Sequence, residues 1–223
     1  MGPGDKPRDD KRARGTHTVK IYGDLNSGNC LKVKSTADLL GLTYEWIAVD
    51  VTKGGAKTPA FLAMNPQGQV PAIELSDGRT LAQSNAVIRY LARGTRLLPD
   101  DAWTQAKIDE WLFWEQYSHE PYVAVCRYHM SYLGKSKESR DPQRVERGEK
   151  ALDHMNTMLE GRDFLVGDTL TIADIALLAY THVAHEGGFD LTARPNVQAW
   201  IIRCDVNFGL KLRTATAAPG DRH

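Results

Sequence analysis

The chain has 223 residues, of which 42% are hydrophobic and 25% are charged, and its 28 lysines and arginines balance its 28 aspartates and glutamates. This composition is that of a folded globular protein and excludes a fibrous or disordered chain. The balanced charge disfavours binding to nucleic acid, and no stretch approaches the ~18 apolar residues of a membrane helix. We therefore expect a cytoplasmic protein with neither nucleic acid nor a membrane as its partner.

The three cysteines, Cys30, Cys126 and Cys204, are odd in number and far apart in the sequence. This spacing argues against a disulfide framework and against a zinc site, so we expect no metal. Residues 1–17 are polar and charged without an apolar core, which indicates a disordered extension rather than a secretory signal.

The N-terminal half begins with a strand, helix, strand pattern. β-branched and aromatic residues at 18–22 and 43–49 predict strands, and apolar residues at helical spacing over 30–40 predict a helix between them. This order implies a parallel strand pair with a right-handed crossover. Residues 50–69 follow as a loop with at most one helical turn.

A hairpin and a helix complete this half. Strand patterns at 70–75 and 80–82 flank the turn residues Asp77 and Gly78. Residues 84–93 predict a helix with Ser84 as its N-cap.

Every pattern after residue 102 is helical. Helices are predicted at 102–133, 143–159, 171–184 and 195–202, and the nearly all-apolar segment 171–184 is expected to be the core helix. The expected organisation is, in chain order, a disordered extension (1–17), an α/β domain (18–94), a linker (95–101), an all-helical domain (102–213) and a flexible tail (214–223).

The dipeptide Val70-Pro71 opens a predicted strand, where proline cannot donate a ladder hydrogen bond. A cis bond here would turn the amide and carbonyl of Val70 outward, ready to pair with an extended peptide ligand. A trans proline at a strand edge is the simpler interpretation, and the residues alone favour it.

Polar residues also open two predicted helices. Ser84 and the free amides can hold a carboxylate, with Gln83 placed for an ammonium or amide group, although simple capping is the commoner outcome. Ser27 and Cys30 put a hydroxyl and a thiol at a helix N-terminus, where a thiolate is best stabilised. Alternatively, Ser27 is only a cap and Cys30 a small buried residue. Residues 171–174 form a capping box, which we interpret as structural.

Together these segments resemble the cytosolic glutathione transferases, especially the theta-like and bacterial members. Residues 21–30 (IYGDLNSGNC) are similar to the first strand and catalytic loop, in which a serine precedes a cysteine by three residues. Residues 65–72 (NPQGQVPA) resemble the N-P-x-G-x-V-P segment, whose proline is cis. Residues 83–86 (QSNA) resemble the [QE]-S-x-A segment, and 171–174 (TIAD) the capping motif of the C-terminal domain. The resemblance covers 18–202.

The resemblance implies an α/β thioredoxin-like N-terminal domain plus an all-α C-terminal helical domain. Glutathione, the co-substrate, would lie on the first domain and the electrophile between the two. The implied glutathione-binding residues are Lys57, Gln69, Val70, Pro71, Gln83 and Ser84. Val70 would pair with the cysteinyl backbone, Gln83 and Ser84 with the γ-glutamyl end, and Lys57 and Gln69 with the glycyl carboxylate.

The implied reaction requires a thiolate, whereas a free thiol has a pKa near ~8.5. A shift of about two units needs ~2.7 kcal/mol. One hydroxyl hydrogen bond to a charged sulfur gives roughly 1.5–3 kcal/mol, and a helix N-terminus adds ~0.3–1. A single well-placed Ser27, helped by the amides of the helix N-terminus, is therefore sufficient in magnitude to activate the thiol. We rank Ser27 first as the activating residue, then Asn29 and Cys30, with Tyr22 last.

The predicted helix at 102–133 carries the candidates for the electrophile pocket. Trp111 and Trp114 are expected in the core, whereas the polar groups of Tyr117, His119 and Arg127 are expected to face the cleft.

The leading hypothesis is a glutathione transferase that adds the thiolate to hydrophobic electrophiles and has scope for reducing organic peroxides. One alternative is a thiol-disulfide oxidoreductase that uses Cys30, and another is a non-catalytic binding module of the same fold. The expected partners are glutathione, a small hydrophobic electrophile and a second copy of the chain in a homodimer.

Overall fold

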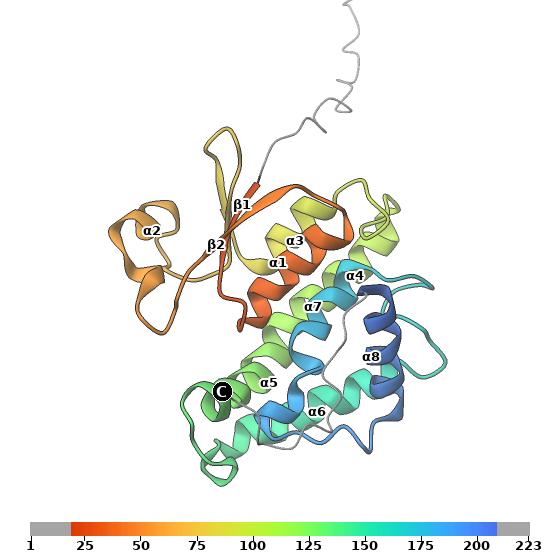
Figure 1. Cartoon of the computed structure of the whole chain (residues 1–223). Coiled ribbons are helices and arrows are strands. Elements are labelled where there is room, and N and C mark those ends of the chain that lie inside the picture. Colours follow the sequence, from red (N-terminus) through yellow and green to blue (C-terminus); the bar gives the residue numbers. More distant parts are fainter. Residues whose placement is uncertain (1–18, 209–223) are drawn as a thin grey trace, which may run out of the picture.

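The computed structural model describes residues 19–208 as a mixed sheet with its helices, packed against a helical bundle (Figure 1). The expected extension at 1–17 and tail at 214–223 lie outside the described residues. Within 19–208, no helix is both long enough and apolar enough to cross a membrane.

The N-terminal part is an α/β domain of the predicted thioredoxin-like type. Its elements are β1 (Val19–Gly23), α1 (Gly28–Leu39), β2 (Tyr44–Ala48), α2 (Pro59–Met64), β3 (Ala72–Glu74), β4 (Thr80–Ala82) and α3 (Ser84–Ala92). The strand order is β2-β1-β3-β4, with β1 parallel to β2 and antiparallel to β3. Helices α1 and α3 pack together on one side of the sheet, and α2 lies on the other (Figure 1).

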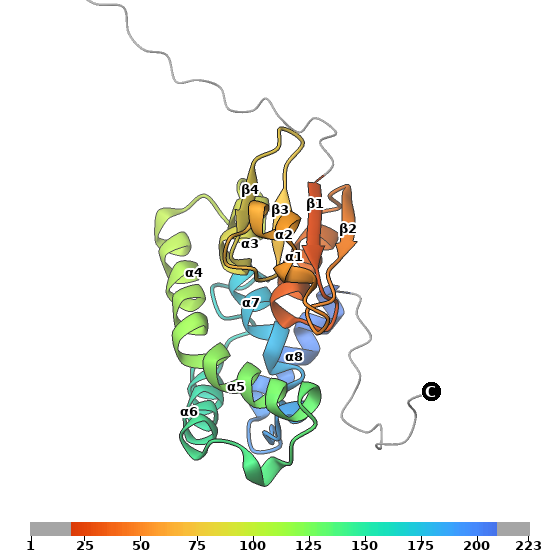
Figure 2. The same cartoon turned by 90° about the vertical axis from the view of Figure 1, so that its left-hand side faces the viewer.

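The C-terminal part is the predicted all-helical domain. Its α-helices are α4 (Ala102–Trp114), α5 (Glu120–Arg127), α6 (Pro142–Met158), α7 (Ile172–Thr181) and α8 (Pro195–Phe208). Figure 2 shows α4 extending along the side of the molecule from the level of α3 toward α5 and α6.

The single helix predicted over 102–133 is interrupted twice. π-Helical segments occupy Glu115–His119 and Tyr128–Tyr132, on either side of α5. Pro121, in the first turn of α5, has no amide hydrogen for the helical ladder, which accounts for the first irregularity.

Helix α7 is buried along its whole length, as predicted for the core helix. The predicted capping box is present: the Thr171 hydroxyl accepts a bond from the Ala173 amide, and the Asp174 carboxylate accepts one from the Thr171 amide at 2.9 Å. Asp174 also accepts a bond from the indole of Trp200 at 2.9 Å. These bonds satisfy a carboxylate whose burial raises its pKa.

The stretch expected as a linker is packed into the core. Leu97 and Leu98 are buried, and the Leu97 carbonyl accepts a hydrogen bond from the amide of Ile172 at the start of α7. Ile21 and Ile73 of the sheet belong to the same apolar cluster as Ile172. One continuous core therefore joins the two parts and fixes the surfaces that meet at their boundary.

Candidate active site

A cleft of about 610 Å³ opens where the two parts of the chain meet, a size suited to a small ligand. Its walls come from the segment 51–71, from the N-terminal ends of α1 and α3, and from Gln116, Glu120 and Tyr128 of the helical domain.

The segment before β3 forms one wall of the cleft. The Val70-Pro71 peptide is cis, as the resemblance implies and against the interpretation that the residues alone favoured. The Asn65 side-chain amide donates to the carbonyl of Gln69 at 2.8 Å and so fixes the residue that precedes this peptide. Gln69, Val70 and Pro71 all line the cleft.

The N-terminus of α3 forms a second wall. The N-cap is Gln83 rather than the predicted Ser84, and Gln83 adopts a φ of 70°, a left-handed conformation that is unfavourable for residues other than glycine. The Gln83 side chain makes no capping bond and instead donates to the Gln67 side chain at 2.9 Å. Ser84 is only 6% exposed, so its hydroxyl is held at the cleft wall.

The N-terminus of α1 meets that of α3 through Asn29. The Ser84 hydroxyl donates to the Asn29 side-chain oxygen at 3.0 Å, and the Asn29 side-chain nitrogen donates to Glu120 at 2.6 Å. The backbone amide of Asn29 donates to the hydroxyl of Tyr180 on α7 at 3.2 Å. Both domains therefore fix the orientation of Asn29.

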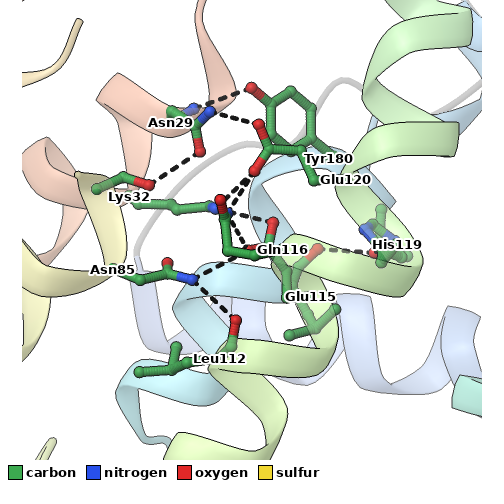
Figure 3. Close-up of polar contacts among 12 residues, drawn as sticks. Asn29, Lys32, Asn85, Leu112, Glu115, Gln116, His119, Glu120 and Tyr180 are labelled. Carbon is green, nitrogen blue, oxygen red and sulfur yellow. Dashed lines mark hydrogen bonds and ion pairs between the residues drawn. The ribbon is translucent and has the colours of Figure 1, made fainter. Parts of the chain in front are cut away.

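A buried polar network lies behind this wall (Figure 3). Lys32 of α1 and Glu115 of the helical domain have fully buried side chains, and their charged groups are 2.8 Å apart. Asn85 and Gln116 donate to the other oxygen of Glu115, at 3.1 and 2.7 Å. The ammonium of Lys32 also lies 3.7 Å from Glu120.

The sequence did not reveal this network. A lysine on a helix, such as Lys32, is normally expected to face solvent. Glu115, Gln116 and Glu120 belong to a segment that was expected to be one continuous helix, which gave no reason to expect them at the domain boundary. No motif in the sequence marks these residues; the nearly all-apolar stretch at 171–184 indicates only that other helices cover α7 on every side.

Comparison with known proteins assigns the family. Residues 26–93 match the glutathione S-transferase N-terminal domain, and residues 113–205 match the glutathione S-transferase C-terminal domain. A glutathione S-transferase-like protein of a Fusarium species is 35% identical over 199 residues, which are 82% of this chain and 87% of the relative. The chain belongs to the glutathione S-transferase family.

Solved structures agree with this assignment. The crystal structure of a glutathione S-transferase from Pseudomonas fluorescens has a TM-score of 0.81 and 50% identity, covering 84% of this chain and 94% of that one. Ure2p in complex with glutathione has a TM-score of 0.76 and 25% identity, covering 84% and 94%. The chain is accordingly an enzyme, a glutathione transferase with the fold of that family.

In this transferase, Ser27 is the N-cap of α1 and its side chain makes no capping bond. Its hydroxyl faces the sulfur of Cys30, which also accepts a hydrogen bond from the Asp24 amide at 3.4 Å. Burial of Cys30 outweighs both contacts and raises the pKa of its thiol. A buried thiol with a raised pKa is a poor nucleophile, which disfavours the oxidoreductase alternative.

Tyr22 lies away from this cleft. Its hydroxyl donates to Glu74 at 2.8 Å, and burial together with that carboxylate raises the pKa of Tyr22 to about 12. The ring lines a separate apolar pocket with Phe61 of α2. This geometry gives Tyr22 no route to a thiol at the ends of α1 and α3.

The three residues expected at the electrophile pocket do not gather there. Tyr117 is 81% exposed and lies outside the cleft lining. His119 is fully buried, bonds Thr181 at 3.0 Å, and has a pKa lowered to about 3 by burial. Arg127 pairs with Glu186 at 2.6 Å instead of opening into the cleft. Tyr117 and His119 lie within the π-helical segment Glu115–His119, and Arg127 follows it, so none of the three keeps the regular helical position that the sequence pattern assumed.

Asn29 and all six predicted glutathione-binding residues line the cleft, whereas Ser27 and Cys30 are not among its lining residues. Lys57 lies on the segment opposite α1, and its ammonium donates to the Gln67 carbonyl at 3.3 Å. Trp111 is buried in the core, as predicted, and Trp114 is half-buried and packs against that core. Within 19–208 no group of three or more His, Cys, Asp or Glu side chains is placed to hold a metal ion.

Proposed function

We propose that this glutathione transferase is of the theta-like, bacterial type, acts in the cytoplasm, and joins the thiolate of glutathione to small hydrophobic electrophiles. The observation that carries the proposal is the cleft in which Val70, Ser84 and the N-terminus of α1 converge. An exposed backbone segment for a peptide and a helix N-terminus for a carboxylate are together what glutathione requires.

Glutathione is proposed to lie along the wall formed by Val70 and Pro71, with its cysteinyl backbone paired to Val70. Its γ-glutamyl carboxylate would meet the N-terminus of α3 at Gln83 and Ser84, where the helix dipole is favourable. Its glycyl carboxylate would meet Lys57 and Gln69. The complex of Ure2p with glutathione supports binding of this ligand by the fold.

Ser27 is the proposed activating residue. Its hydroxyl makes no capping bond and faces the Cys30 sulfur, and a rotation of the hydroxyl would turn its donor to the thiolate of glutathione. Asn29 ranks second because its side-chain nitrogen already donates to Glu120. Cys30 ranks below both because its thiol is buried.

Calorimetry with glutathione and a conjugation assay with an activated aryl halide test this proposal. Wild-type enzyme should bind glutathione and form the conjugate, and Ser84→Ala should weaken binding. Ser136→Ala, at an exposed serine that does not line the cleft, is the matched control and should leave binding unchanged. Binding without conjugation would favour the non-catalytic module. Glutathione-dependent disulfide exchange that is lost in Cys30→Ser but kept in Ser27→Ala would favour the oxidoreductase.

The enzyme is further proposed to be a homodimer through the exposed side of α4. Trp103 and Phe113 are each 74% exposed there, with Tyr117 at 81% and Tyr90 of α3 at 47%. Monomers rarely expose so many large apolar side chains along one helix and the segments beside it. Sedimentation should give about twice the 24.8 kDa of one chain. Phe113→Glu should lower that mass, whereas Val206→Glu, at an exposed position of α8, should not.

A further inference from the structure

We infer that the carboxylate of Glu120 binds the ammonium group of the γ-glutamyl residue and thereby makes the cleft selective for glutathione over analogues without that charge. The inference rests on the proposed function and names the residue that recognises one end of its substrate. Glu120 reaches the cleft from α5, so the helical domain contributes directly to recognition.

The cleft offers one cationic and one anionic side chain to a ligand. Of the described residues that line it, Lys57 and Glu120 alone carry a charge; the others are apolar, glycine, amide, hydroxyl or phenol residues. Gln83, next to the proposed γ-glutamyl position, is neutral and already donates to Gln67. Glutathione carries a carboxylate at its glycyl end and an ammonium at its γ-glutamyl end. Lys57 is suited to the first group, and Glu120 is the single anionic partner for the second.

The buried network leaves the charge of Glu120 in excess. Lys32 lies 2.8 Å from Glu115 but 3.7 Å from Glu120, so its charge is used mainly by Glu115. Two carboxylates share one lysine, which leaves one net negative charge at the boundary of the cleft. The Glu120 side chain is 21% exposed, whereas those of Lys32 and Glu115 are fully buried, so the excess charge is accessible from the cleft only at Glu120.

The hydrogen bonds of Glu120 leave room for a ligand. One oxygen accepts from the Asn29 side chain at 2.6 Å and the other from the Gln116 side chain. A carboxylate offers about four acceptor positions, so these bonds do not exhaust it. They do fix the direction in which the carboxylate faces (Figure 3).

Asn29 bridges Glu120 and Ser84, the residue at the proposed site of the γ-glutamyl carboxylate. The same amide group accepts from Ser84 at 3.0 Å and donates to Glu120 at 2.6 Å. Ser84 and Glu120 are therefore separated by one side-chain amide. The ammonium and carboxylate of the γ-glutamyl residue are attached to the same carbon atom. The positive helix end at Ser84 can therefore bind the carboxylate while the nearby Glu120 binds the ammonium.

The test compares two ligands on two proteins by calorimetry. The ligands are glutathione and glutaryl-cysteinyl-glycine, which lacks only the ammonium. For wild type, removal of the ammonium should weaken binding about ten- to hundredfold, as for a lost charge-assisted hydrogen bond. For Glu120→Gln, the two ligands should bind within about threefold of each other. Glu110→Gln, which removes an exposed glutamate of α4 outside the cleft, is the matched control and should behave as wild type.

An equal loss of affinity for both ligands in Glu120→Gln would overturn the inference, because it would show that Glu120 acts only by holding Asn29. Equal binding of both ligands by wild type would overturn it as well, while leaving the proposed function intact. Absence of glutathione binding by wild type would instead remove the proposed function itself. If Glu120→Gln does not fold, Glu120→Asp retains the charge at a greater distance and should reduce the preference for glutathione.

Discussion

Arg127 of α5 donates a hydrogen bond from its guanidinium to the backbone carbonyl of Asn26, at 2.9 Å, across the boundary between the two domains. The opposite edge of the guanidinium donates to Glu186 at 2.6 Å, and its face lies over the ring of Tyr132. Asn26 directly precedes Ser27, so the helical domain holds the loop that carries the proposed activating hydroxyl.

We predict that Arg127→Ala lowers the conjugation rate about ten- to hundredfold through loss of a charge-assisted hydrogen bond to this loop. The affinity for glutathione should change little, because the proposed contacts lie at Val70 and Ser84. The measurement is a comparison of kcat, KM and the thiolate absorbance of bound glutathione. Arg147→Ala, which removes a surface arginine bonded to Tyr122, is the control. Equal losses in both variants would contradict the positioning role.

We predict that Ser27→Ala raises the pKa of bound glutathione by about one to two units, as expected for the loss of one charge-assisted bond. The rate at neutral pH should fall accordingly, whereas Cys30→Ser and Tyr22→Phe should retain the wild-type rate. The pH dependence of thiolate absorbance measures the shift. An unchanged thiolate pKa in Ser27→Ala would transfer the role to Asn29.

We predict that Lys32→Met destabilises the protein by about 3–5 kcal/mol, because it leaves the carboxylate of Glu115 buried and unpaired. For a chain of this size the melting temperature should fall by about 6–20 °C. The double variant Lys32→Met with Glu115→Leu should recover most of the loss. Thermal unfolding of Lys32→Met, Glu115→Leu and the double variant completes the cycle. A double variant less stable than Lys32→Met alone would be inconsistent with an unpaired charge as the cause.

We predict that acid destabilises the protein partly through His119. Its pKa is lowered to about 3 in the folded state from an ordinary value of 6.5, so the unfolded chain binds the proton first as pH falls. The stabilising contribution is complete above pH 6.5 and declines by about 1.4 kcal/mol per pH unit between pH 6.5 and 3. Urea unfolding at pH 7 and 5 should therefore show about 2 kcal/mol less pH dependence in His119→Gln. The same pH dependence in both proteins would mean that His119 titrates normally.

The fold was largely predictable because its signals are local. Alternating strand patterns, the turn at Asp77 and Gly78, and the capping box at Thr171 and Asp174 each depend on neighbours in sequence, and the structure has all of them. The π-helical segments were missed because a helix with one extra residue per turn keeps an apolar pattern close to that of an α-helix.

The site was predictable only where a backbone motif defines it. The Val70-Pro71 and Gln83-Ser84 segments have recognisable sequences and line the cleft. Glu120 was missed, and His119 was expected at the cleft, because the direction of a side chain on this helix depends on the irregular turn before α5. Contacts between residues as distant as Lys32 and Glu115 leave no pattern in a single sequence.

Lys32 and Glu115 form an ion pair with one residue from each domain, and both side chains are fully buried. The residues at positions 32 and 115 must therefore have matching charges, although they belong to different domains. A chimera joined between α3 and α4 would match a buried charge with whatever residue the other parent supplies, and an apolar residue there would leave that charge alone. Recombination between relatives should therefore succeed only when both positions are inherited together, even if every surface residue is exchanged.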